Sequence, residues 1–291
     1  PVYWSPSSET ALAEAEIEYK DRVDNSIYVG FTVEEGNNYV QKGDILVIWT
    51  TTPWTLPGNT AVCVGETFDY CTVKVNDKNY IVAKDLAESL MKLFEFENYE
   101  ITSTFKGKDL FGVKYKHPFM DRVSIVVTGS HVTLDAGTGL VHNAPAYGED
   151  DFFIGKKYNL EMINGINDQG YLNENSGMFE GLYFEDANKI IPDWLKENGY
   201  LLKLQKIKHS YPHDWRTKKP VIYRATKQWF CSVEKIKDQI LKELDENVKF
   251  HTSWGKTRIY NMIKDRVDWC ISRQRAWGVP IPIFYNEDGS E

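Results

Sequence analysis

The chain has little of what marks a membrane-bound, secreted or zinc-binding protein. None of its apolar runs approaches the roughly 20 residues that a membrane-spanning helix needs, and no signal-peptide pattern opens the sequence. It has only four cysteines, none in CxxC spacing, and no Asn-X-Ser/Thr sequon occurs. These absences argue against a zinc ribbon and favour reduced thiols, so we expect a cytoplasmic protein without membrane contact.

Signatures of several enzyme classes are missing as well. The sequence has no GxSxG elbow and no cysteine with an obvious histidine partner, so a covalent intermediate is not indicated. Gly137 and Gly139 form a GxG that lacks the third glycine of a dinucleotide-binding fingerprint. His209 and His213 are separated by Pro212, which argues against a helical HExxH metal pair.

The residues that are present indicate a packed globular chain. Aromatic residues make up 14% of the 291 residues, nine of them tryptophan, which is not typical of a disordered chain. This length suffices for one large domain or two ordinary ones. The sequence opens at Pro1 and closes on NEDGSE, so we expect it to be a segment excised from a longer protein.

Charge is unevenly distributed along the chain. The net charge of −8 argues against indiscriminate nucleic-acid binding. Between Lys203 and Lys227, however, eight lysines and arginines occur with a single acid, Asp214, which gives a local charge of +7. This basic stripe is typical of a surface that binds a polyanion in one orientation, and equally of a solvated surface segment.

Local patterns predict many short strands and few helices. Runs rich in β-branched residues, bounded by turn clusters, predict strands at 27–33, 45–51, 60–64, 70–75, 79–83, 99–104, 112–116, 123–128 and 131–143. Apolar spacing of the helical type predicts helices at 84–94, 149–158, 186–198 and 235–247. The helix dipole should stabilise the acids that open the helix at 149 and favour their ionised form. The pattern favours a mainly β fold, a barrel with peripheral helices.

The stretch IWTTTPWTLPGN joins a predicted strand to a proline-rich turn. The run Ile45–Trp49 predicts the strand and Pro53 ends it, so Thr50, Thr51 and Thr52 lie at a strand end. Hydroxyls and freed backbone groups can face a ligand at such a position. The alternative is a threonine-rich strand end whose tryptophans pack in the core.

A second stretch, DAGTGLVHNAPAYGEDD, ends at Asp151. It places His142 at a predicted strand end and Asp151 in the first turn of a predicted helix, so both side chains can face one cleft. Gly137 and Gly139 permit close backbone approach to a ligand. The alternative is a structural histidine and an acid that merely begins a helix.

Several separated motifs together resemble the editing domain of isoleucyl-tRNA synthetases. Besides IWTTTPWTLPGN and GTGLVHNAPAYGEDD, they are PVYWSPSSETALAEAEIEY, HSYPHDWRTKKPVIYRATKQWF and DWCISRQRAWGVPIP. Thr52-Pro53-Trp54 is the isoleucyl form of the threonine motif, where the valyl and leucyl enzymes carry an Arg-Pro-acidic pattern. The motifs keep the order of the family and cover essentially the whole chain.

The resemblance implies a role for each candidate residue. Asp151 would bind the α-ammonium of a misattached amino acid, and the catalytic threonines Thr50, Thr51 and Thr52 would hold the terminal ribose and position water. His142, also catalytic, would be the bulky side chain that lies beside the amino-acid side chain. The remaining implied residues are Trp49, Trp54, Thr55, Asn59, Gly137 and Thr138 for substrate, Arg216, Lys218 and Lys219 for tRNA, and Trp277 for the isoleucine pocket of the parent enzyme; no metal ligand is implied.

Two positions depart from the common bacterial form HTAPGHG. Asn143 and Tyr147 replace its threonine and its second histidine. A role that rests on the second histidine is therefore in doubt in this chain.

The resemblance also implies a fold and a division into domains. It implies a closed β-barrel editing domain of the valyl, isoleucyl and leucyl type, followed by a partial catalytic-core segment. We expect a β-ribbon linker at 1–25, the editing domain at 26–208, and a returning linker with the partial catalytic-core segment at 209–291.

The implied reaction is hydrolysis of valine wrongly attached to tRNA(Ile), or of valyl-adenylate, by direct attack of water. We expect a monomer whose partner is tRNA(Ile). Neither HIGH nor KMSKS occurs, so the segment should need no cofactor and should not activate amino acids. The parent enzyme would use ATP and Mg to ligate isoleucine to tRNA(Ile). The rival interpretation is a non-catalytic tRNA-binding module with a vestigial pocket.

Overall fold

A computed structural model describes residues 1–266 and 268–287 of the chain, most of whose regular structure is β-sheet. The strands are β1 (Val2–Ser5), β2 (Thr10–Leu12), β3 (Ile17–Glu35), β4 (Ile45–Thr50), β5 (Ala61–Val64), β6 (Asp69–Val75), β7 (Lys78–Ala83), β8 (Glu100–Lys106), β9 (Lys114–Lys116), β10 (Val123–Thr128), β11 (Leu140–Asn143), β12 (Leu201–Asp214), β13 (Ile222–Arg224), β14 (Phe230–Cys231) and β15 (Trp269–Cys270).

The helices are short and few. The α-helices are α1 (Ala87–Leu93), α2 (Glu149–Tyr158), α3 (Phe184–Glu197), α4 (Glu234–Glu246) and α5 (Ser253–Lys264), and the 3-10 turns are η1 (Glu14–Glu16), η2 (Pro53–Gly58), η3 (Lys84–Leu86), η4 (Gly107–Leu110) and η5 (Glu174–Phe179). In the part of the chain that the structure describes, no helix has the length and apolarity to cross a bilayer. The expected mainly β fold with peripheral helices is confirmed.

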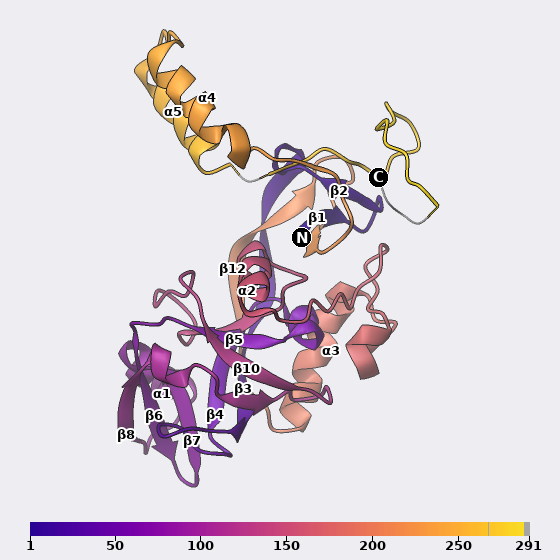
Figure 1. Cartoon of the computed structure of the whole chain (residues 1–291). Coiled ribbons are helices and arrows are strands. Elements are labelled where there is room, and N and C mark those ends of the chain that lie inside the picture. The colour runs from indigo at the N-terminus through magenta and orange to yellow at the C-terminus, as the bar shows by residue number, and fades with distance from the viewer. Residues whose placement is uncertain (267, 288–291) are drawn as a thin grey trace.

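The strand pairings of the main sheet return to their starting strand. Strand β3 pairs with β9, β9 with β10, β10 with β5, β5 with β11 and β11 with β4, and β4 pairs in turn with β3. Strands β7, β6 and β8 extend the sheet beyond β4, in the lower part of Figure 1. The apolar side chains that point inside the ring include Phe31, Leu46, Val62 and Tyr115, all of them 0% exposed and all in one core cluster.

Two registers within this ring bring the two predicted motifs together. Strand β4 runs parallel to β11 with Trp49 opposite Val141, and antiparallel to β3 with Thr50 opposite Ile27. The threonines that follow Trp49 therefore lie beside His142, although the two segments are far apart in the sequence.

Strands β3 and β12 form a long antiparallel ribbon that leaves the ring. Their pairing runs from Leu201 opposite Val29 to Asp214 opposite Ile17. In Figure 1 the ribbon leads from the ring to the small sheet of β1, β2 and β13, and the hairpin of α4 and α5 projects beyond that sheet. A ribbon linker was expected at 1–25, and β3 extends that ribbon without a break into the ring.

Three helices cover the ring and its extension. Helix α3 buries Phe184, which contacts Trp54 of η2 edge to face, with ring centroids 6.0 Å apart. Helix α1 buries Met91 in a second core cluster beside β6 and β7. Helix α2 places Ile154 in a third cluster with Cys63 of β5 and Val127 of β10.

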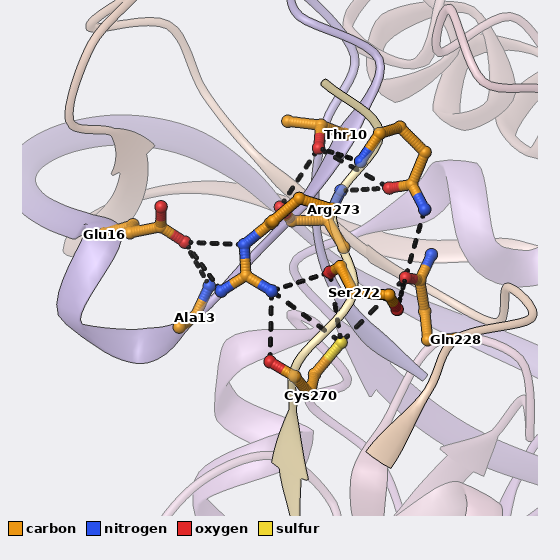
Figure 2. A network of polar contacts seen from close by, with 9 residues as sticks. Thr10, Ala13, Glu16, Gln228, Cys270, Ser272 and Arg273 are labelled. Atoms are coloured by element: carbon orange, nitrogen blue, oxygen red, sulfur yellow. Dashed lines mark hydrogen bonds and ion pairs between the residues drawn. The ribbon is translucent and has the colours of Figure 1, made fainter. Parts of the chain in front are cut away.

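A polar network ties the C-terminal segment to the start of the ribbon, as Figure 2 shows. The Arg273 guanidinium donates to Glu16 Oε2 from Nε at 3.1 Å and from Nη2 at 2.9 Å. The same oxygen accepts from the Ala13 amide at 2.8 Å, and the Glu16 carbonyl accepts from the Trp215 amide at 3.1 Å. Glu16 thus lies where β3 begins and β12 ends, and it bonds to the segments on both sides.

One predicted strand is shorter in the structure, and one observed helix was not predicted. The strand expected at 131–143 forms only at Leu140–Asn143, because Gly137 and Gly139 adopt positive φ of 78° and 77°, which interrupts extended backbone. Helix α5 was not predicted; no residue of α5 is buried, and its apolar residues Trp254 and Met262 are exposed. The weak amphipathic pattern explains the omission.

Candidate functional site

A cavity of about 350 Å³ lies where β4 and β11 end. Its walls come from the threonine-rich stretch, from the turn before β11, and from the first turn of α2. The lining residues are Trp49, Thr50, Thr51, Thr52, Thr55, His131, Thr133, Ala136, Gly137, Thr138, Gly139, Leu140, Val141, His142, Tyr147 and Asp151. The structure thus gathers nine of the residues that the sequence predicted for catalysis and substrate binding around one cavity.

The threonine hydroxyls form one edge of the cavity. Thr50 Oγ1 accepts from the Thr52 amide at 3.1 Å and lies 3.3 Å from Thr52 Oγ1, while Thr55 Oγ1 donates to the Thr52 carbonyl at 2.9 Å. The Thr51 hydroxyl makes no hydrogen bond to any residue that the structure describes. Thr50, Thr52 and Thr55 therefore hold the turn, and Thr51 leaves its hydroxyl available to a ligand.

His142 is buried at the base of the cavity, with 8% of its surface exposed. Its Nε2 lies 3.0 Å from Thr55 Oγ1 and its Nδ1 lies 2.8 Å from Asn59 Nδ2, so protein groups engage both ring nitrogens. Burial lowers the pKa of His142 from 6.5 to about 4. The imidazole is therefore neutral at pH 7.

Asp151, in the first turn of α2, brings a carboxylate to the wall of the cavity. It accepts from Asn143 Nδ2 at 3.1 Å and from the Ala144 amide at 3.3 Å. Burial raises the pKa of Asp151 from 3.8 to about 7, with a further increase from the neighbouring Asp150. The helix dipole was expected to favour the ionised form of this acid, but the net shift goes the other way, because desolvation of the carboxylate is the largest effect.

The two departures from the common motif have structural roles. The side-chain amide of Asn143 donates to Asp151, and the backbone carbonyl of Asn143 accepts from the Thr60 amide at 3.1 Å. Tyr147 packs edge to face on Trp54, with centroids 4.8 Å apart, and its hydroxyl accepts from the Gly165 amide at 2.6 Å. Tyr147 therefore fills space and closes a wall.

One glycine brings the two motifs into contact. A Cβ atom on Gly137, at φ +78°, would lie 3.2 Å from the Trp49 ring, which leaves no room for a larger residue without a shift. The Trp49 indole in turn donates to Ser26 Oγ on β3. Trp49 and Gly137 thus form a packed wall of the cavity, and their contact with a substrate stays a prediction.

Two predicted substrate residues do not line this cavity. Asn59 is 0% exposed and bonds only to protein groups. Trp54 lies behind the threonine turn in a second, smaller cavity of about 180 Å³, which shares Thr52, Thr55 and Tyr147 with the first. Trp54 is held from α3, because its amide donates to Asn188 Oδ1 at 3.1 Å.

The basic stripe is partly neutralised by acids. Lys203, Lys208, Lys218 and Arg224 form ion pairs with Glu95, Asp21, Glu18 and Asp168, respectively. Arg216, Lys218 and Lys219 are exposed on the turn that follows β12, and Asp214 holds that turn by accepting from Ser5, Ser8 and the Arg216 amide.

Trp277 lies in the C-terminal segment, far along the chain from the cavity motifs, and is 93% exposed. Nothing in the described residues covers it, so its expected place in an isoleucine pocket stays a prediction about the parent enzyme.

Sequence reasoning missed His131 and Thr133, which line the cavity from the turn before β11. The His131 Nε2 is buried without a hydrogen-bond partner in the described residues, and burial lowers the pKa of His131. The sequence signal was the Gly129-Ser130 pair, which is typical of a turn. In the structure a Cβ on Gly129 would lie 2.6 Å from the His131 ring, so the turn leaves no room for a larger residue there. The predicted strand at 131–143 concealed this turn.

The sequence is similar to those of isoleucine–tRNA ligases. Isoleucine–tRNA ligase of Bacillus anthracis is 56% identical over 289 residues, covering 99% of this chain and 31% of that protein. Isoleucine–tRNA ligase of Macrococcus caseolyticus is 55% identical over 291 residues, covering 99% of this chain and 32% of that protein. The chain thus spans about a third of the length of these relatives.

A solved structure shares the fold. The crystal structure of GlLeuRS-CP1 superposes with a TM-score of 0.51 at 16% identity, covering 62% of this chain and 98% of that one. The family model described as tRNA synthetases class I (I, L, M and V) matches residues 1–291. The chain therefore belongs to the class I tRNA synthetases of the I, L, M and V group.

Proposed function

We propose that this chain is the editing part of an isoleucine–tRNA ligase, and that its cavity hydrolyses valine wrongly attached to tRNA(Ile), or valyl-adenylate. One observation carries the proposal: a single cavity contains a carboxylate, a set of threonine hydroxyls and a buried neutral imidazole. The match to isoleucine–tRNA ligases, at 55–56% identity over 99% of this chain, supports tRNA(Ile) as the tRNA and valine as the wrongly attached amino acid.

The substrate would be held at two points. The Asp151 carboxylate would accept charge-assisted hydrogen bonds from the α-ammonium of the amino acid. The Thr51 hydroxyl, free of protein partners among the described residues, would bond the terminal ribose. Holding the ester at both ends fixes its carbonyl carbon for attack by a water molecule, and the terminal ribose oxygen leaves as a hydroxyl.

His142 would act as a wall and not as a base in this scheme. Both of its ring nitrogens bond to protein groups, and its lowered pKa makes proton uptake near pH 7 unfavourable. Discrimination between valine and isoleucine requires such a wall. Isoleucine has more apolar surface than valine and would therefore bind more tightly in a pocket large enough for both. One methylene contributes only ~1–3 kcal/mol, a general value for which synthetases of this kind are themselves the standard example. Exclusion of isoleucine must therefore be steric.

The residues of this chain do not fit the cofactors of the ligation reaction. Neither HIGH nor KMSKS is present in the sequence, and the described residues contain no cluster of three metal-ligating side chains. We therefore assign no step to ATP or Mg here, and place ATP- and Mg-dependent ligation of isoleucine in the parent enzyme. Within that enzyme, we propose a linker at 1–25, the editing domain at 26–208 and a core segment at 209–291. The strand ring of the editing domain would be the expected barrel. The enzyme would act on tRNA(Ile) as a monomer.

Release of valine from Val-tRNA(Ile) by the purified 291-residue chain tests the proposal. The sharpest variant is Thr51→Val, which removes a hydroxyl that bonds to no described residue and should slow deacylation about twofold to tenfold. Thr60→Val is the matched control, because the buried Thr60 hydroxyl has no partner among the described residues and does not line the cavity. If the wild-type chain binds tRNA(Ile) but does not accelerate hydrolysis, the chain is a non-catalytic binding module.

A further inference from the structure

A chain of hydrogen bonds runs beneath the cavity from the core of the ring to the threonine turn. The Tyr115 hydroxyl donates to Asn59 Oδ1 at 2.6 Å, and Asn59 Nδ2 lies 2.8 Å from His142 Nδ1. His142 Nε2 lies 3.0 Å from Thr55 Oγ1, which donates to the Thr52 carbonyl at 2.9 Å. Tyr115 and Asn59 are both 0% exposed, so the chain is anchored in the core.

The orientation of the Asn59 amide is fixed independently of the histidine. Its Nδ2 lies 2.9 Å from the Ala61 carbonyl, which can only accept, and 3.4 Å from the Asn143 carbonyl. Exchanging the nitrogen and the oxygen of the amide would place Oδ1 against these two carbonyls, leaving no donor between them. Asn59 therefore presents an N–H group to His142.

The direction of this bond determines the tautomer of His142. A neutral imidazole carries one proton, and Nδ1 must be unprotonated in order to accept from Asn59. The proton therefore resides on Nε2, which donates to Thr55 Oγ1. The Thr55 hydroxyl uses its own proton on the Thr52 carbonyl, so its oxygen is free to accept from His142 Nε2.

We propose that Asn59, held by Tyr115, is a positioning residue that locks His142 in the Nε2-protonated tautomer and in one ring orientation. Turning the ring over would replace both nitrogens by carbon atoms facing Asn59 and Thr55. The locked ring can neither take a proton from the attacking water nor rotate out of the cavity wall. The inference rests on the proposed function for its catalytic consequence, but the tautomer itself is a property of the free protein.

The tautomer can be read directly by NMR. The 291-residue chain labelled with nitrogen-15 histidine has six imidazoles, and loss of one signal set in His142→Gln assigns His142. We expect a protonated Nε2 and an unprotonated Nδ1, unchanged from pH 6 to pH 9. A proton on Nδ1, or titration of His142 between pH 6 and pH 7, would overturn the proposal, and both are measured on the wild-type chain once His142→Gln has assigned the signals.

Two substitutions then test the role of Asn59. Asn59→Asp has nearly the same shape, but at pH 9 its carboxylate only accepts, so Nδ1 of His142 should become protonated. Tyr115→Phe removes the donor to Asn59 Oδ1 and should leave the amide free to turn, giving a mixture of tautomers. Tyr70→Phe is the matched control for the NMR spectrum, because the Tyr70 hydroxyl is equally buried but bonds to the Gly139 carbonyl and the Gly65 amide instead.

Activity separates this inference from the proposed function. We expect Asn59→Asp to slow Val-tRNA(Ile) deacylation at least tenfold at pH 9, together with the change of tautomer. Wild-type His142 nitrogen signals in folded Asn59→Asp at pH 9 would show that Asn59 does not set the tautomer. A wild-type chain with the expected tautomer but no deacylation would refute the proposed function and leave the positioning of His142 intact.

Discussion

Replacing Asp151 with asparagine tests the ammonium contact most directly. The Asp151 carboxylate accepts two hydrogen bonds from neutral groups, Asn143 and Ala144, and forms no ion pair with any cation of the described residues. Its negative charge is therefore buried without a counter-charge, and the α-ammonium of the substrate would supply one. Asp151→Asn keeps the size of the side chain and removes the charge.

The size of the effect follows from the cost of the buried charge. A rise of the Asp151 pKa from 3.8 to about 7 corresponds to roughly 4 kcal/mol of unfavourable ionisation, at ~1.36 kcal/mol per pKa unit. An ammonium that binds there recovers part of this free energy. Truncating one partner of a buried charge pair costs about 2–5 kcal/mol, so kcat/KM for Val-tRNA(Ile) should fall by about 30-fold to several thousandfold.

The raised pKa of Asp151 determines how both kcat/KM and the stability of the folded chain should change with pH. The carboxyl of the free protein loses its proton near pH 7, so wild-type kcat/KM should rise with pH through that value, and Asp151→Asn should lose the rise. The folded chain holds this proton more tightly than the unfolded chain. The contribution of Asp151 to stability is therefore complete below pH 4 and is lost as pH rises to about 7. At pH 8 the uncharged asparagine should unfold at the same temperature as wild type or higher.

The assay compares deacylation rates of wild type, Asp151→Asn and Asp150→Asn at several pH values. Asp150 is the matched control, because it carries the same charge in the same helix turn but is exposed and does not line the cavity. Its replacement should change the rate less than threefold. A rate for Asp151→Asn within twofold of wild type would show that the carboxylate only begins a helix.

Three other expectations follow from the site and the surface. His142→Ala should enlarge the cavity and allow hydrolysis of Ile-tRNA(Ile), measured beside Val-tRNA(Ile); a variant that still spares the isoleucyl ester would exclude His142 as the sieve. Replacing Arg216, Lys218 and Lys219 with alanine should weaken tRNA binding and flatten its dependence on salt, and an unchanged slope of log affinity against log salt would exclude that contact. The purified chain should show no isoleucine-dependent pyrophosphate exchange, since it lacks HIGH and KMSKS; robust exchange would refute the proposed boundaries.

Much of the β-structure could be predicted because the strand pattern is strong and local. The run Ile45–Thr50 was expected at 45–51, and the helix expected at 149–158 is present as Glu149–Tyr158. The failure at 131–139 has a physical reason: β-branched residues favour extended backbone, but two glycines at positive φ turn the chain there. The type of a residue favours one backbone conformation, but the conformation of neighbouring residues, here the two glycines, determines whether a strand forms.

The candidate site could be predicted only through its motifs. No local sequence pattern predicts that Trp49 of β4 pairs with Val141 of β11. This strand register places the threonines beside His142. Asn59 shows the same limit. Its place in the motif indicated a substrate contact, whereas its complete burial and its bonds to Ala61 and His142 make it part of the support beneath the cavity.

Burial shifts the two titratable groups that the sequence predicted for the site in opposite directions, and both shifts favour the neutral form. The pKa of His142 falls to about 4 and that of Asp151 rises to about 7, so at neutral pH the imidazole is neutral and the carboxyl is only partly ionised. If the α-ammonium of the substrate binds Asp151 as proposed, it will favour the ionised form of the carboxylate. Binding of the amino group and ionisation of Asp151 should then be linked. We expect an ester without the amino group to gain nothing from Asp151, because His142, with both nitrogens bonded, offers no charge in its place.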